Sequence, residues 1–347
     1  MLVAAVIRPF FRGSGSLSGA HLSVLLLRRA AQLLLATGAL LVSEQASADP
    51  SKIDPEYAHN YAELETPRMT ALGGAIRASS NSLAALYSNP ANMAIAQTYH
   101  VGAFAQIYPE TRRQTYGGAI VDSLISSTGM AGGFGGTYTF QDRDGIDRQW
   151  MDLRFALALP LADIVYIGLG GRYITLQQNG LGPLGASFAS GGIRGANIIQ
   201  TVTIDAGLTV RPTPELKIAL TGNNLTSLDT ALFPIMGGLG IGYDTEDFGL
   251  SSDITLESRT YDKLNLRVRA GGEVLFIDRL MVRLGYRYDQ RQESHAICGG
   301  LGYVDKMFSI DASVRRSVVG PGYTAIVFGL TGHIESMGLG RVAPDEQ

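Results

Sequence analysis

From Thr98 onward, apolar and polar side chains alternate along short segments that are separated by turn residues. The segment 279–289 is the clearest example. Its apolar or aromatic set is Leu280, Val282, Leu284, Tyr286 and Tyr288, and its other set is Arg279, Met281, Arg283, Gly285, Arg287 and Asp289. Segments 202–211, 264–274 and 308–315 repeat the pattern. Because successive side chains of a strand point to opposite faces, this period of two predicts strands with one apolar face and one charged face.

Fourteen such segments follow one another along the chain. They are 98–108, 114–123, 128–140, 149–159, 164–177, 200–211, 214–224, 235–244, 248–258, 264–276, 279–289, 294–304, 307–316 and 322–333. Each is at or a little above the roughly 9 to 11 residues with which a tilted strand crosses a membrane. A soluble sandwich also alternates, but its solvent face needs no mixed charges in every strand. The pattern therefore predicts an all-β fold, a transmembrane antiparallel β-barrel of about 14 strands over residues 98–333.

The connections between the segments have two lengths. The even-to-odd connections are short, namely 124–127, 160–163, 212–213, 245–247, 277–278 and 305–306. The outward connections include the long stretches 141–148, 178–199 and 225–234. Outer-membrane barrels have short periplasmic turns and longer outer loops, so this parity places both ends of the barrel, and the tail 334–347, in the periplasm.

The N-terminal region has the order of features that a secretory signal peptide requires. Arg28-Arg29 precedes the apolar run from Ala30 to Val42, and the small-residue sequence Ala46-Ser47-Ala48 follows. We therefore predict a signal peptide over residues 1–48. A membrane anchor is the alternative, but about 13 apolar residues fall short of the roughly 20 that a spanning helix needs. Residues 49–97 are then a periplasmic extension and a short helical hatch.

The segment 72–95 differs from all that follows, because its apolar positions have a helical spacing that ends at Asn89-Pro90. A proline stops a helix and favours an extended residue before it. An ordinary short helix that ends in a turn has the same local pattern. The residues Gly73, Gly74, Ala75, Ala85, Leu86, Tyr87, Asn89, Pro90 and Ala91 resemble the N-terminal hatch of the FadL-type outer-membrane transporters of hydrophobic compounds. The related PorV-type barrel proteins carry a similar segment, whereas Arg77 to Ser82 lacks the acidic residues usual in those families.

The resemblance implies three groups of site residues. The hatch residues are Gly73, Gly74, Tyr87, Asn89, Pro90 and Ala91. Gly132, Gly133, Gly135 and Gly136 lie in the third strand, where the resemblance implies an inward kink and a lateral opening in the wall; glycines that fill a tight interior are the alternative. Two long apolar connections, with Leu181, Leu184, Phe188, Leu228, Leu232 and Phe233, would capture ligand. Packing of these loops on each other is the other interpretation.

Composition excludes several classes of protein. The 347 residues carry a net charge of -3, which gives no basic surface for nucleic acid, and the single Cys298 excludes an internal disulfide or a multi-cysteine metal site. Gly-x-Ser-x-Gly, His-Glu-x-x-His and Walker patterns are missing from the sequence. We therefore expect no enzyme, no cofactor and no metal.

The leading hypothesis is an outer-membrane channel for passive uptake of hydrophobic small molecules, such as long-chain fatty acids or aromatic hydrocarbons. Its expected partners are outer-membrane lipids and a hydrophobic ligand. The alternative is a PorV-like barrel that serves as a docking or shuttle partner in protein export. The apolar loops favour transport, whereas the short remaining loops and the missing acidic residues of the hatch weaken a strict FadL-type assignment.

Overall fold

The computed structural model describes residues 64–334, apart from 97, 125, 127, 143–144, 146, 163, 180–196, 227–233, 258–263, 291 and 321. The chain divides into two units, Met1–Pro50 and Ser51–Gln347. Every described residue belongs to the second unit. The predicted signal peptide, the extension before Leu64 and the tail after Ile334 lie outside the described residues.

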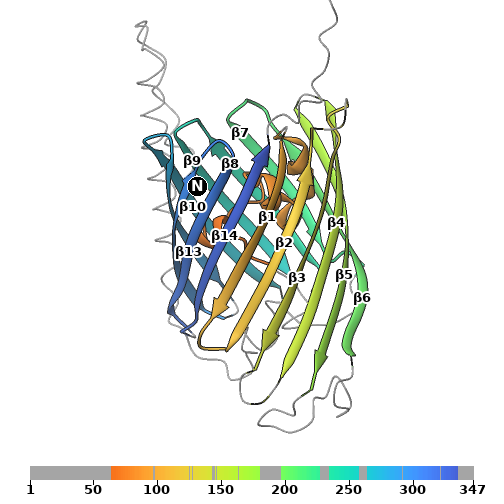
Figure 1. Ribbon diagram of the computed structural model, residues 1–347, viewed down its shortest axis with the longest axis vertical. Coiled ribbons are helices and arrows are strands. Elements are labelled where there is room, and N and C mark those ends of the chain that lie inside the picture. Colours follow the sequence, from red (N-terminus) through yellow and green to blue (C-terminus); the bar gives the residue numbers. More distant parts are fainter. Residues whose placement is uncertain are drawn as a thin grey trace, which may run out of the picture. The chain divides into compact units, whose positions relative to one another are not determined.

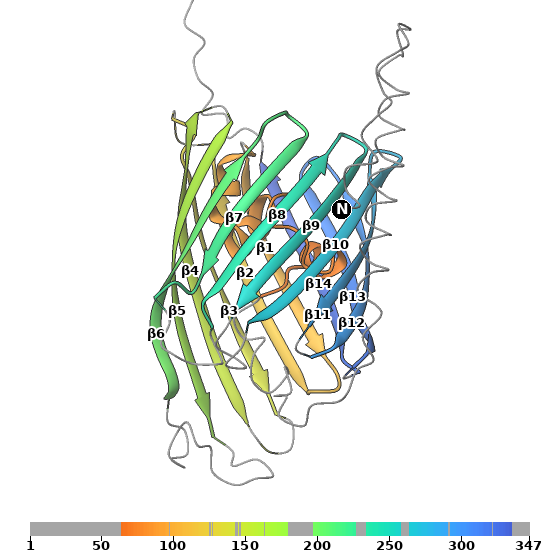
Figure 2. The same cartoon turned by 180° about the vertical axis from the view of Figure 1, so that it is seen from behind.

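Fourteen antiparallel strands form a closed barrel in which each strand pairs with its neighbours in sequence and β1 pairs with β14 (Figures 1 and 2). The strands are β1 (Tyr99–Tyr108), β2 (Arg113–Asp122), β3 (Ala131–Gln141), β4 (Arg148–Ala162), β5 (Val165–Gln178), β6 (Asn197–Val210), β7 (Leu216–Asn223), β8 (Met236–Asp244), β9 (Phe248–Glu257), β10 (Asn265–Phe276), β11 (Leu280–Asp289), β12 (Ser294–Val304), β13 (Phe308–Val319) and β14 (Thr324–Ile334). We call the end where β1 begins and β14 ends the turn end, and the opposite end the loop end.

All fourteen predicted strands are present, so the predicted fold is confirmed. The third strand was expected to begin at residue 128 and begins at Ala131, and no other boundary differs by more than these three residues. The predicted facing also holds. Leu284 is 67% exposed on the outer face, whereas its neighbour Arg283 is 6% exposed on the inner face.

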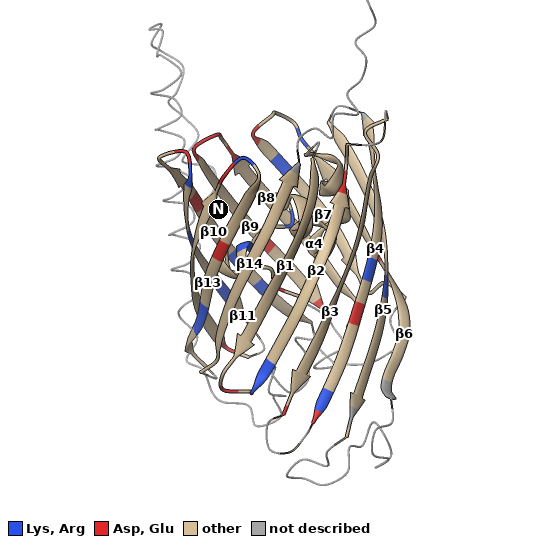
Figure 3. Cartoon of the chain, viewed as in Figure 1, with Lys and Arg blue, Asp and Glu red and all other residues tan. Residues whose placement is uncertain are grey.

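Charged residues occur along several strands of the barrel (Figure 3), and many of their side chains are buried on the inner face, where they pair across strands. Arg172 Nη2 lies 2.6 Å from Asp152 Oδ2, and Arg267 Nε lies 2.8 Å from Asp289 Oδ2. Charges in a low-dielectric interior are tolerated when they are paired and hydrogen-bonded. The outer face is apolar along the strands, which is the pattern of a wall that lies against lipid.

Within the described residues, three short helices precede β1, and both views show them inside the barrel (Figures 1 and 2). They are α3 (Pro67–Ala71), α4 (Ser82–Ser88) and the 3-10 helix η2 (Pro90–Ala94). We call residues 64–95 the hatch. Asn89 caps η2 because its side chain accepts a hydrogen bond from the backbone N–H of Ala91, and Pro90 occupies the first helical position, where no N–H is needed. Within the described residues, no helix is long and apolar enough to cross a membrane.

Candidate functional site

The Asn89-Pro90-Ala91 motif packs closely against the wall of the barrel. Asn89 is fully buried and donates from Nδ2 to the Arg77 carbonyl (2.8 Å) and to Thr209 Oγ1 of β6 (2.9 Å). A Cβ at Gly207 of β6 would collide with the Asn89 side chain. The motif therefore packs tightly against β6 at a position where the strand has no side chain.

Gly73 and Gly74 form the second close contact of the hatch. Both have positive φ, +67° and +88°, a conformation that glycine adopts without strain. A Cβ at Gly73 would lie 2.6 Å from the Tyr286 carbonyl oxygen of β11, and one at Gly74 would lie 2.9 Å from the Arg269 side chain of β10. The two glycines thus let the hatch turn directly against β10 and β11.

Tyr87 links α4 to β1 and β2. Its hydroxyl donates to the Gly118 carbonyl of β2 at 2.9 Å, and its ring meets Phe104 of β1 edge-on, with centroids 5.6 Å apart. Burial raises the pKa of the Tyr87 hydroxyl above its ordinary range, so it remains a donor. Arg154 of β4 donates to the Tyr87 carbonyl at 3.0 Å. All six predicted hatch residues therefore lie within one buried segment that contacts strands around the barrel.

Charged groups bind the hatch to the wall, in pairings that no local sequence pattern predicts. Glu65 pairs with Arg287 of β11 (2.9 Å) and with Arg315 of β13. Arg68 pairs with Glu273 of β10. Asp253 of β9 accepts hydrogen bonds of 2.9 Å from the backbone N–H groups of Ile76 and Arg77. Asp253 of the wall thus places a carboxylate beside the start of residues 77–82, the part of the hatch that lacks acidic residues.

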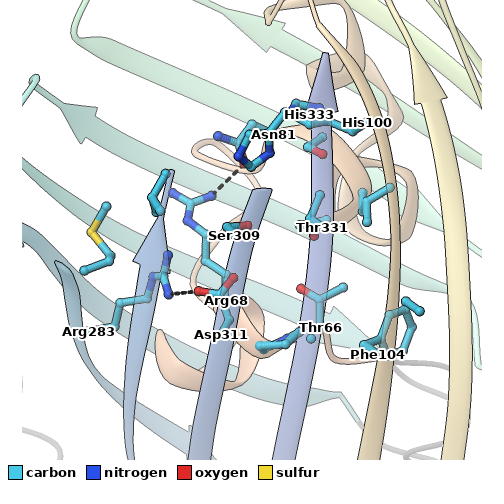
Figure 4. A pocket seen from close by; sticks show the side chains of 18 of the residues that line it. Thr66, Arg68, Asn81, His100, Phe104, Arg283, Ser309, Asp311, Thr331 and His333 are labelled. Carbon is cyan, nitrogen blue, oxygen red and sulfur yellow. Dashed lines mark hydrogen bonds and ion pairs between the residues drawn. The ribbon is translucent and has the colours of Figure 1, made fainter. Parts of the chain in front are cut away.

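A cavity of about 310 Å³ lies between the hatch and the wall formed by β10–β14 and β1 (Figure 4). One side is mainly apolar, with Pro67, Leu83 and Phe104. The other side carries a continuous chain of charges, because Arg283 pairs with both Glu273 (2.9 Å) and Asp311 (2.5 Å). This chain consists of the basic groups Arg68 and Arg283 and the acidic groups Glu273 and Asp311, so its charges balance.

The four glycines of β3 produce no bulge in the ladders that the strand forms. β3 pairs with β2 from Gly132 to Gln141 and with β4 from Ala131 to Gln141, without a register shift in either ladder. A Cβ at Gly133 would lie 2.9 Å from Met93 Sδ, and one at Gly135 would lie 2.6 Å from the Tyr87 hydroxyl. Those at Gly132 and Gly136 would point toward Leu157 and Leu153. The inner pair therefore gives the hatch room, as the alternative interpretation expected, and a lateral opening at β3 stays a prediction.

The inner face carries a second apolar cluster, apart from the one that packs against the hatch. Trp150 of β4, Ile174 and Leu176 of β5, Ile199 of β6 and Met236 of β8 form a buried cluster at the loop end, which we call the apolar patch. The alternating pattern did not reveal this patch, although Ile174 and Leu176 occupy alternate positions on the face that is polar in other strands. The predicted capture residues Leu181, Leu184, Phe188, Leu228, Leu232 and Phe233 lie in the neighbouring connections, outside the described residues.

Comparison with known proteins places this architecture. No family model matches the sequence, and no curated protein matches it. Among solved structures, the CymD monoaromatic hydrocarbon channel is 13% identical, with a TM-score of 0.61 over 80% of this chain and 98% of that one. The fold is that of the hydrocarbon channels.

Two further structures with the hydrocarbon-channel fold agree. The toluene transporter TbuX of Ralstonia pickettii is 14% identical, with a TM-score of 0.55 over 79% of this chain and 98% of that one. The toluene transporter TodX of Pseudomonas putida is 13% identical, with a TM-score of 0.53 over the same shares. At these identities the likeness concerns the fold, and the fold implied by the FadL-type resemblance is confirmed.

Proposed function

We propose that the chain is an outer-membrane channel for passive uptake of small hydrophobic molecules. The observation that carries the proposal is the apolar patch, a buried cluster of five apolar side chains on the inner face at the loop end, because such side chains favour an apolar molecule over a polar one. The likeness of the fold to that of channels for monoaromatic hydrocarbons supports the same conclusion. The apolar outer face supports a place in the outer membrane, in contact with its lipids.

The energetics of this pathway need no cofactor. Each CH₂ group that an apolar molecule moves out of water contributes roughly 0.8 kcal/mol, so transfer from water onto the patch is favourable. The charges of the inner face are engaged with one another, as in the pairs Arg172–Asp152 and Arg267–Asp289. A neutral molecule leaves these pairs undisturbed, whereas an acid would have to compete for an arginine. We therefore favour neutral aromatic hydrocarbons over fatty acids as ligands.

The test is uptake of radiolabelled toluene by cells whose own hydrocarbon channel has been deleted. We expect the unmodified protein to restore uptake above the empty-vector level, and Leu176→Asn, which places an amide in the apolar patch, to reduce it. Thr139→Asn is the matched control, since Thr139 is buried on the inner face of β3, outside the patch. Absence of uptake by the unmodified, correctly folded protein would reject transport and favour the role as a partner in protein export.

A further inference from the structure

Two histidines face each other across the ladder that closes the barrel. His100 is the second residue of β1 and His333 is the last but one of β14, and the two are directly opposite in the register of this ladder. Their rings meet edge-on, with centroids 5.5 Å apart. Figure 4 shows both side chains close together among the residues that line the cavity beside the hatch. The first and the last strand thus each contribute one imidazole to the same place at the turn end.

Hydrogen bonds decide which nitrogen of each ring holds a lone pair. His333 Nε2 lies 3.1 Å from the Asp305 carbonyl oxygen, and because a carbonyl only accepts, this nitrogen carries a proton. In the neutral ring the lone pair is then on Nδ1. His100 Nδ1 lies 3.1 Å from Thr98 Oγ1, and when it donates to this hydroxyl the lone pair is on Nε2. Among the described residues, no hydrogen bond engages either of these remaining nitrogens.

The pair has the chemistry of metal-binding histidines. Such a histidine donates its other ring N–H to an oxygen atom, which fixes the orientation of the ring, and both His100 and His333 have an oxygen in that position. Zinc binds imidazole nitrogen at about 2.0–2.1 Å, so two imidazoles on one tetrahedral ion have ring centres roughly 5 Å apart. The observed 5.5 Å is close to this separation. A square-planar ion would bring two adjacent imidazoles closer together.

The surroundings of the pair suit a cation that keeps water in its coordination shell. The two arginines that line the cavity, Arg68 and Arg283, are compensated by Glu273 and Asp311. Both histidines are half-buried, and the cavity of about 310 Å³ leaves room for water beside them. Because two paired strands hold the rings, their relative position is fixed before an ion arrives.

We propose that His100 and His333 bind a divalent transition-metal ion, that Zn²⁺ fits the site best, and that water completes its coordination. Among the described residues, no group of three or more histidine, cysteine and acidic side chains could hold a metal, so this is an open site with two protein ligands. The composition predicted no metal site, and the ladder that closes the barrel is what brings the two histidines together. An ion held there binds the folded barrel and not the unfolded chain, so it stabilises the closure of β1 on β14.

Zinc binding by the purified, tag-free protein in detergent tests the proposal. Calorimetric titration with ZnCl₂ should give one ion per chain for the unmodified protein, and no binding for His100→Gln or His333→Gln. His295→Gln is the matched control, because His295 lies at the loop end of β12 beside Tyr286 and Tyr288, and it should bind as the unmodified protein does. Binding that survives in either variant of the pair, or its absence in the unmodified folded protein, would overturn the proposal.

A second variant keeps both ligands and changes only the group that orients one of them. Thr98→Val removes the hydroxyl beside His100 Nδ1, and loss of such a contact typically lowers metal affinity about 10–100-fold. An affinity equal to that of the unmodified protein would remove His100 as a ligand, also where a histidine variant does not fold. X-ray absorption at the zinc edge should show imidazole nitrogen at about 2.0–2.1 Å, and a spectrum with oxygen ligands alone would mean an adventitious ion only. None of these measurements involves uptake, so their outcome does not depend on the proposed function.

Discussion

The inner faces of β10–β13 and of the loop ends of β4–β6 differ although both belong to one wall. On β10–β13 the strands are two-faced, with Arg267, Arg283 and Arg287 inside and apolar side chains outside. At the loop ends of β4–β6 the inner face carries apolar side chains, including Ile174 and Ile199, while Val202 points outward. The charged region binds the hatch through the ion pairs of Glu65 and Arg68, whereas the apolar patch is a cluster of apolar side chains. Ion pairs thus anchor the hatch on one part of the inner face, and apolar side chains pack together on another.

The largest expected effect comes from Glu65, which joins the start of the hatch to Arg287 and Arg315. Glu65→Ala leaves two buried guanidinium groups without this carboxylate, and breaking a buried pair typically costs about 3–5 kcal/mol. We expect a lower free energy of unfolding in urea, measured in phospholipid vesicles, and faster proteolysis of the hatch. Stability equal to that of the unmodified protein would show that the ion pairs do not anchor the hatch.

A charge on the lipid face of the two-faced strands comes next. Leu284→Arg should cost about 2–4 kcal/mol, because the arginine would face hydrocarbon. Ser309→Arg on β13 should be mild, since Ser309 lines the cavity beside the hatch. Urea midpoints in vesicles compare the two variants directly, and equal losses would mean that the two faces have been assigned wrongly.

A substitution at Gly207, where the Asn89 motif packs against β6, should have an intermediate effect. Gly207→Ala places a methyl group against the Asn89 side chain, and overpacking of this kind costs about 1–3 kcal/mol. Gly237→Ala on β8 is the control, because a Cβ there meets nothing within 4 Å. Protease protection of the hatch should fall in the first variant alone; equal protection in both would remove the argument for tight packing of the motif.

The smallest effect is expected at the loop end, where Glu110 and Arg316 form an exposed pair with side chains 33% and 54% exposed. Exposed ion pairs contribute about 0–1 kcal/mol, so Glu110→Gln should hardly change the urea midpoint. A loss as large as that of Glu65→Ala would show that burial does not distinguish the two ion pairs.

The sequence was sufficient for the barrel but not for the contacts inside it. The period of two depends on neighbouring residues, so Arg283 and Leu284 could be assigned to opposite faces without knowledge of the fold. The hatch motif was found because Asn89-Pro90 interrupts a helical pattern. The pairing of Glu65 with Arg315 joins residues 250 positions apart, and no local pattern encodes it.

The glycines of β3 illustrate the opposite difficulty. The sequence pointed to Gly133 and Gly135 for a kink and, as the alternative, for a tight interior; they mark a close approach, but the sequence does not say what approaches. The apolar patch was missed because its members come from four strands, with two of them, Ile174 and Leu176, on one strand. Such a site is visible only once the barrel has closed.

The closure of the barrel also joins the hatch to the last strands of the chain. The hatch is made before any strand, yet Glu65 binds Arg315 of β13 and Pro67 packs against Gly329 of β14. Its binding site is therefore complete only when the last strands arrive, and once β1 has paired with β14 the ring leaves it enclosed. The hatch, which precedes every strand in the sequence, therefore completes its contacts only with the last strands of the barrel.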